Sequence, residues 1–145
     1  VVTYDGGEKE EAIISLEILK SKAKKKPAIN GNNIGFNVEI NITTTTDEIE
    51  QTESNLLDGE VWKRLEREVE KMLEKNIKET ITKLQQQYNS DIFGFGRTLS
   101  KDQPKIWDLK ADNWNTVFEE LNINVNVEVY INSSALLSKP LEVRD

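Results

Sequence analysis

The 145-residue chain carries 19 basic and 26 acidic residues, a formal net charge of −7, and neither cysteine nor histidine. The negative charge disfavours nucleic acid as a partner, because its backbone demands a basic footprint on the protein. Without cysteine there are no disulfides and no thiolate chemistry, and without histidine the commonest general base and zinc ligand are missing. Both absences weigh against an enzyme. The catalytic groups that an enzyme could still use are carboxylates or a Ser-Lys pair.

The first predicted strand covers residues 12–19, where Ile14, Leu16 and Ile18 share one face. A dense basic run follows it and ends before Pro27. It comprises Lys20, Lys22, Lys24, Lys25 and Lys26. One interpretation is a solvated strand end and turn, whose charges only keep an edge soluble and unpaired. The other is a patch that faces anionic lipid or an acidic partner, with weak, salt-sensitive binding to anionic vesicles.

Residues 30–33, with the sequence Asn-Gly-Asn-Asn, have the composition of a tight turn. Residues 34–42 then alternate between apolar and polar side chains, as expected of a strand with one buried face. We therefore expect the first two strands to form an antiparallel hairpin. The acidic residues 47–53 that follow lack the ligand spacing of a calcium loop and are interpreted as a solvated connector.

A long amphipathic helix is predicted over residues 58–88, where apolar side chains recur every three or four positions. At 1.5 Å per residue it would extend about 45 Å. The absence of a strict heptad favours a helix that covers a sheet over a coiled coil. Its apolar residues are Val61, Leu65, Val69, Met72, Leu73, Ile77, Ile81, Leu84 and Tyr88.

The last third of the chain predicts short helices followed by a strand. Pro104 suits the first turn of a helix, and Trp107, Trp114 and Phe118 follow at nearly helical spacing. Residues 122–132 alternate strictly and predict a strand with one buried and one solvated face. The fold class that results is α+β, a small antiparallel sheet covered on one face by the long helix and the shorter helices. We expect a single domain over residues 1–145.

Residues 91–96, Asp-Ile-Phe-Gly-Phe-Gly, are a candidate ligand motif, but each chemistry that they suggest lacks a residue it needs. A dinucleotide-binding loop requires a third glycine and a preceding strand. An RNA-recognition strand requires a basic residue where Phe93 stands. A calcium loop requires a ligand at Phe93 and a glutamate at Ser100. The packing interpretation is that Gly94 and Gly96 allow close backbone approach, while Phe93 and Phe95 fill the core.

The run from Gln85 to Leu137 resembles the C-terminal domain of the Ger(x)C family, the C subunits of spore nutrient germinant receptors. Upstream, the stretch from Leu16 to Pro27 and the long helix also fit the family. A glycine that many relatives have after the last strand is replaced here by Asn132-Ser-Ser-Ala135. The matching residues are Gln86, Tyr88, Asp91 to Gly96, Pro104, Trp107, Trp114, Phe118 and the final alternating strand.

The resemblance implies a lipoprotein on the outer face of the spore inner membrane, anchored through an N-terminal cysteine outside this sequence. It implies action with two integral membrane subunits, A and B, in nutrient-triggered germination. It implies no catalytic activity, cofactor or metal, and no ligand residues carry over from it. We interpret the chain, which begins at Val1, as a fragment of a longer protein. The leading hypothesis is a non-catalytic domain that makes protein contacts; the alternative is a small-solute (germinant) binding module.

Overall fold

The computed structural model describes residues 2–5, 11–46, 49–50 and 59–132. These residues fall into two compact units. Unit 1 lies within residues 1–22, 41–71 and 128–145, and unit 2 consists of residues 23–40 and 72–127. A single domain over residues 1–145 stays a prediction.

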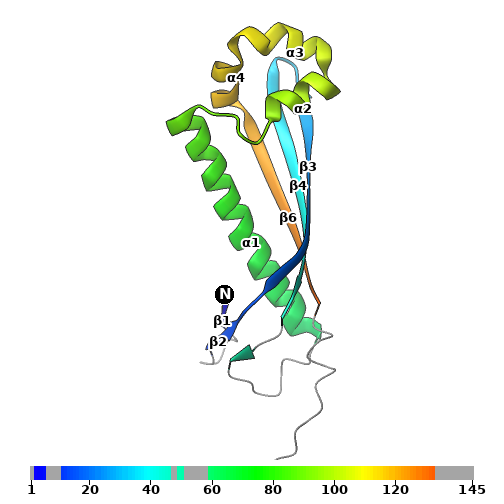
Figure 1. Ribbon diagram of the computed structural model, residues 1–145, viewed down its shortest axis with the longest axis vertical. Coiled ribbons are helices and arrows are strands. Elements are labelled where there is room, and N and C mark those ends of the chain that lie inside the picture. The colour runs from blue at the N-terminus through cyan, green and yellow to red at the C-terminus, as the bar shows by residue number, and fades with distance from the viewer. Residues whose placement is uncertain (1, 6–10, 47–48, 51–58, 133–145) are drawn as a thin grey trace, which may run out of the picture. The chain divides into compact units, whose positions relative to one another are not determined.

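The described elements follow the predicted order of strands, long helix, short helices and strand (Figure 1). In chain order they are β1 (Val2–Asp5), β2 (Glu11–Ile14), β3 (Glu17–Asn30), β4 (Asn33–Thr45), β5 (Ile49–Glu50), α1 (Gly59–Lys83), the π-helical turn η2 (Leu84–Tyr88), α2 (Phe95–Asp102), α3 (Pro104–Lys110), the 3-10 turn η3 (Ala111–Asn113), α4 (Trp114–Glu120) and β6 (Asn122–Asn132).

The described strands form two three-stranded sheets, ordered β1-β2-β5 and β3-β4-β6. The first is antiparallel, with Val2 opposite Ile14 and Ile13 opposite Glu50. In the second, β3 and β4 are joined by a two-residue turn. Gly31 has a φ of +59° there and Asn32 has no positive φ, which is the pattern of a type II′ turn. The hairpin predicted from the asparagine-glycine run is confirmed.

The β4 and β6 strands run parallel, which differs from the antiparallel sheet that the sequence predicted. In unit 2 the Asn124 side chain donates to Asn37 Oδ1 at 3.2 Å, and in unit 1 Thr45 Oγ1 donates to Asn132 O at 3.3 Å. Partner numbers rise together along the two strands, as only a parallel pair allows. The long connection through α1 gives the chain room to re-enter the sheet in the same direction. The α+β class is confirmed.

The basic run lies inside a strand, so the turn predicted over it is wrong. The predicted strand over residues 12–19 divides into β2 and the start of β3, and β3 then continues through all five lysines and Pro27 to Asn30. An edge strand tolerates this composition, because charged side chains stay in water and a proline can sit where no ladder hydrogen bond is needed. Of the predicted acidic connector, residues 47–48 and 51–53 lie outside the described residues, while Ile49–Glu50 form β5.

The core of unit 1 is aliphatic except for Trp62 of α1, which is also buried. Leu65 and Val69 of α1 are buried, as are Val129 and Ile131 of β6 and Ile42 of β4. Burying each such side chain contributes about 1.5–3 kcal/mol. The helical and strand periodicities of the sequence therefore predicted these buried positions of α1 and β6 but missed Trp62.

The core of unit 2 combines phenylalanine rings with aliphatic side chains and gathers where α2, α3 and α4 lie close to the β3–β4 turn (Figure 1). Phe36 of β4, Phe95 of α2 and Phe118 of α4 are fully buried in it, together with Ile81 of α1. Tyr88, which the periodicity placed on the apolar face, is exposed. By then the long helix has widened into the π-helical turn, whose i→i+5 hydrogen bonds break the 3.6-residue period.

Candidate functional site

The Asp91 carboxylate organises the motif over residues 91–96 from inside unit 2. Its Oδ1 atom accepts the backbone N–H of Phe95 at 2.8 Å, and Oδ2 accepts the N–H of Gly96 at 2.7 Å. Oδ2 also accepts the indole N–H of Trp114 at 3.0 Å. Asp91 thus satisfies free donors of the first turn of α2 and ties that turn to α4. Both carboxylate oxygens already have partners within the protein.

Glycine is required at positions 94 and 96 for two different physical reasons. Gly94 has a φ of +72°, a left-handed conformation that side chains disfavour, directly before α2. Gly96 is confined by its surroundings. A Cβ there would lie 2.8 Å from Trp114 Nε1 and 3.0 Å from Trp107 Cζ3. A substitution at Gly96 would therefore push against both indoles, including the Trp114 indole that Asp91 holds in place.

The predicted packing aromatics form two ring clusters, with Phe93 as the exception. The ring centroid of Phe95 lies 4.9 Å from that of Phe36 and 6.3 Å from that of Phe118. Trp107 and Trp114 meet edge to face at 5.3 Å. The ring centroid of Phe93 lies 6.3 Å from that of Phe95, but the Phe93 side chain is 41% exposed. Phe93 therefore does not fill the core as expected.

Pro104 and Gln85 fix the ends of the neighbouring helical segments. Pro104 is the first residue of α3, as the sequence predicted. Gln85 is buried, and its Nε2 atom donates to Phe118 O at 2.8 Å and to Leu121 O at 3.0 Å. Sequence reasoning missed Gln85, because nothing distinguishes it from the two glutamines that follow. Its bonds add a second donor to the Phe118 carbonyl, which also accepts the N–H of Leu121 at 3.3 Å, and supply a donor to the carbonyl of the residue that caps α4.

The structure divides the predicted basic patch. In unit 2, Lys25 donates to Phe93 O, and its Nζ atom lies 5.7 Å from the centroid of the Phe95 ring. Lys26 Nζ lies 3.1 Å from Glu39 Oε1. Both lysines therefore make contacts within unit 2. The side chains of Lys24 in unit 2, and of Lys20 and Lys22 in unit 1, are exposed and have no hydrogen bond or ion pair among the described residues.

A row of glutamates on α1 bonds to the backbone of β6, and sequence reasoning missed it. Residues four apart on a helix are separated by about 6 Å, close to the separation of about 6.6 Å between residues two apart on a strand. This match lets successive carboxylates reach successive outward N–H groups. The bonds, each 3.0 Å, run from Ile131 N to Glu66 and Val129 N to Glu70 in unit 1, and from Val127 N to Glu74 in unit 2.

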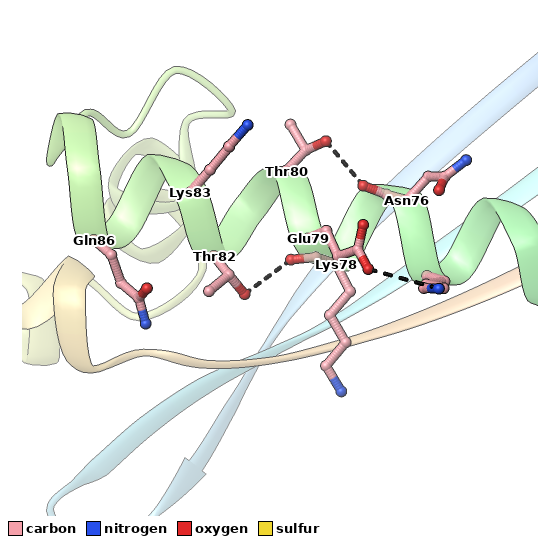
Figure 2. Close-up of a pocket in the computed structure, with 8 residues that line it drawn as sticks. Asn76, Lys78, Glu79, Thr80, Thr82, Lys83 and Gln86 are labelled. Carbon is pink, nitrogen blue, oxygen red and sulfur yellow. Dashed lines mark hydrogen bonds and ion pairs between the residues drawn. The ribbon is translucent and has the colours of Figure 1, made fainter.

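A shallow pocket in unit 2 lies along a single helical stretch (Figure 2). The hydroxyls of Thr80 and Thr82 donate to carbonyls of their own helix at 2.8 and 2.9 Å, and Lys75 and Glu79 lie 4.0 Å apart. These groups are thus bonded within the helix, and the labelled side chains point away from it in different directions (Figure 2). The lining residues are Lys75, Asn76, Lys78, Glu79, Thr80, Thr82, Lys83 and Gln86.

Among the described residues, no group of three aspartate, glutamate, histidine or cysteine side chains is placed to hold a metal ion. No described helix is long and apolar enough to cross a membrane.

Comparison with known proteins assigns the chain to a family. Residues 1–135 match the family described as "Spore germination B3/ GerAC like, C-terminal". The chain belongs to this family. The resemblance that the sequence suggested is therefore confirmed over almost the whole chain. The family description refers to spore germination and names no reaction.

Individual relatives agree with this assignment. The chain is 28% identical over 123 residues to spore germination protein YndF of Bacillus subtilis (strain 168), covering 85% of this chain and 30% of that protein. It is 27% identical over 142 residues to spore germination protein KC of the same organism, covering 97% and 34%. The crystal structure of the GerBC protein matches the fold with a TM-score of 0.72 at 24% identity, covering 83% of this chain and 40% of that one. The chain thus spans about a third of the length of its curated relatives.

Proposed function

We propose that this domain is a non-catalytic part of the C subunit of a spore germinant receptor. It contributes to nutrient-triggered germination through protein–protein contacts at the spore inner membrane. Family membership supports the germination role. The protein-contact role is supported by the hydrogen bonding of the Asp91 carboxylate. Its two oxygens accept hydrogen bonds from Phe95, Gly96 and Trp114, so they are not free for a ligand. The motif over residues 91–96 therefore acts as a scaffold. The surface that this scaffold supports makes the contacts with other proteins.

The partners that fit this role are the A and B membrane subunits of the receptor. The parent protein would be held at the outer face of the spore inner membrane by a lipid anchor upstream of this sequence. The proposal assigns the domain no cofactor. It does not advance the solute-binding alternative, because a solute site needs polar groups that converge from several elements, and the pocket on α1 has one helical stretch as its lining.

Co-purification with the A and B subunits tests this function. The tagged chain should recover both subunits from detergent-solubilised membranes, with and without nutrient, while the tag alone recovers neither. Calorimetric titration of the chain with the nutrient should show no saturable heat. Nutrient binding by the isolated chain, with no recovery of either subunit, would support the solute-binding alternative and contradict the proposal.

A further inference from the structure

The start of β3 is an exposed outer strand of its sheet. β3 lies at one edge of the order β3-β4-β6, with no strand hydrogen-bonded to its other side among the described residues. Over Glu17–Lys22, which belongs to unit 1, every side chain is exposed. Ile18 is 61% exposed and Leu19 57%, so apolar area is presented on both faces of the strand. An exposed strand of this kind can pair with another chain.

The opposite edge of the same sheet is closed in unit 1. There the N–H groups of Val129 and Ile131 on β6 donate to the carboxylates of Glu70 and Glu66, each at 3.0 Å. A strand that approached β6 would find these donors taken. Of the two edges, the stretch Glu17–Lys22 is the one that no strand or carboxylate of the described residues covers.

The turn indicates which backbone groups of β3 face outward. In a two-residue hairpin the closing residues, here Asn30 and Asn33, exchange hydrogen bonds, and bonded and non-bonded positions then alternate along the strand. We therefore expect even-numbered residues of β3 to bond to β4 and odd-numbered residues to point outward. Pro27, which has no N–H, agrees with this alternation. Leu19 and Ser21 would then present N–H and C=O groups to a partner.

We propose that the edge Glu17–Lys22 accepts an extended acidic segment of a partner protein as an added strand. The proposal rests on the proposed protein-contact function and names the surface. Backbone groups of Leu19 and Ser21 would supply the pairing. Lys20 and Lys22 share a face with Ile18 and would select acidic side chains on the same face of the incoming strand. Leu19 would contact apolar side chains on its other face.

A second copy of this chain fits the same edge poorly. Antiparallel pairing of two β3 edges about Ser21 would set Lys20 opposite Lys22 of the other copy, and like charges opposite each other in a sheet are destabilising. A lipid surface would match the lysines, but it has no regular row of donors and acceptors for the backbone. An acidic extended segment uses both features of the edge.

The test is a fluorescence-anisotropy titration of this chain with a labelled, end-capped octapeptide of alternating valine and glutamate. We expect saturable binding that weakens as salt rises. Ser21→Pro removes one outward N–H and should weaken binding by about tenfold or more, whereas the matched control Ser21→Ala keeps the N–H and binds like the parent. Replacing Lys20 and Lys22 by glutamine should remove the preference for this octapeptide over one of alternating valine and lysine.

A second probe keeps the test independent of whether Ser21→Pro folds. The same octapeptide with alternate backbone nitrogens methylated keeps its charges but cannot form a ladder, and it should not bind the parent chain. Equal binding of methylated and unmethylated peptides overturns the proposal. So does binding to phosphatidylcholine–phosphatidylglycerol vesicles that needs Lys20 and Lys22 while the peptide does not bind.

Different results would contradict the strand-addition proposal and the proposed function. Peptide binding without recovery of the A and B subunits would contradict the proposed function and leave the edge proposal standing. Recovery of both subunits by Ser21→Pro at the level of the parent, with no peptide binding by either chain, would contradict the edge proposal alone.

Discussion

The motif around Asp91 and the edge Glu17–Lys22 differ in how their groups are used. At the motif, the carboxylate oxygens have partners, Phe95 is 1% exposed, and Gly96 has no space for a methyl group. At the edge, every side chain is exposed and Lys20 and Lys22 have no ion-pair partner among the described residues. The part of the sequence that most resembles a ligand motif is therefore internal scaffold. The lysine-rich strand has the exposed side chains, and it is the surface proposed for contacts.

The largest expected effect separates two phenylalanines of the motif. Phe95→Ala removes a fully buried ring between Phe36 and Phe118 and should lower the free energy of unfolding by about 3–5 kcal/mol. Phe93→Ala, two residues away and 41% exposed, should cost less than about 1.5 kcal/mol. Urea denaturation of both variants measures the difference. Equal losses would contradict the division between core and surface at this motif.

Asp91→Ala should have the next largest effect. It leaves the N–H groups of Phe95 and Gly96 and the indole of Trp114 without their acceptor, and the unfolding free energy should fall by about 2–3 kcal/mol. Asp102→Ala, at the far end of α2, is the matched control and should change it by less than about 0.5 kcal/mol. A variant at Asp91 that melts like the parent but no longer recovers the A and B subunits would make Asp91 a contact residue instead.

Gly96→Ala tests the space beside the indoles. The added methyl group would overlap Trp114 and Trp107, and such overpacking typically costs about 1–3 kcal/mol. Indole fluorescence should shift as the two rings move apart. Gly59→Ala is the control, because nothing lies within 4 Å of a Cβ at that position. An unchanged melting temperature and emission spectrum at Gly96→Ala would show that the predicted crowding is absent.

The smallest effect concerns two adjacent lysines. Lys25→Gln removes the contact with the Phe95 ring and weakens the bond to Phe93 O, and it should cost about 0.5–1 kcal/mol. Lys24→Gln should cost nothing measurable, because Lys24 has no partner among the described residues. Thermal melts at two salt concentrations compare them. Equal stability of both variants would contradict the difference between Lys24 and Lys25 and would support a uniformly solvated lysine run.

Local patterns in the sequence predicted much of the fold, because each depends on neighbouring residues. The turn at Gly31, the start of α3 at Pro104 and the alternation of β6 all have this character. The parallel pairing of β4 and β6 did not follow from sequence, since Asn37 and Asn124 meet only after the whole helical connection is placed.

The candidate site was predictable only in its residue types. Charge patterning identified the lysines, but it could not separate Lys25 from Lys24, because their roles depend on Phe93 and Phe95 far along the chain. No pattern in the sequence singled out the carboxylates of Glu66 and Glu70. Their bonds to β6 become visible only when helix and strand lie side by side.

Hydrogen–deuterium exchange of the chain, alone and co-purified with the A and B subunits, tests the central claim most directly. The amides of Phe95 and Gly96 should exchange slowly in both states, because Asp91 accepts them. The amides of Leu19 and Ser21 should exchange fast in the free chain and at least about tenfold more slowly in the complex, as backbone pairing forms. Protection gained at residues 91–96 on assembly, with none at residues 17–22, would contradict the account.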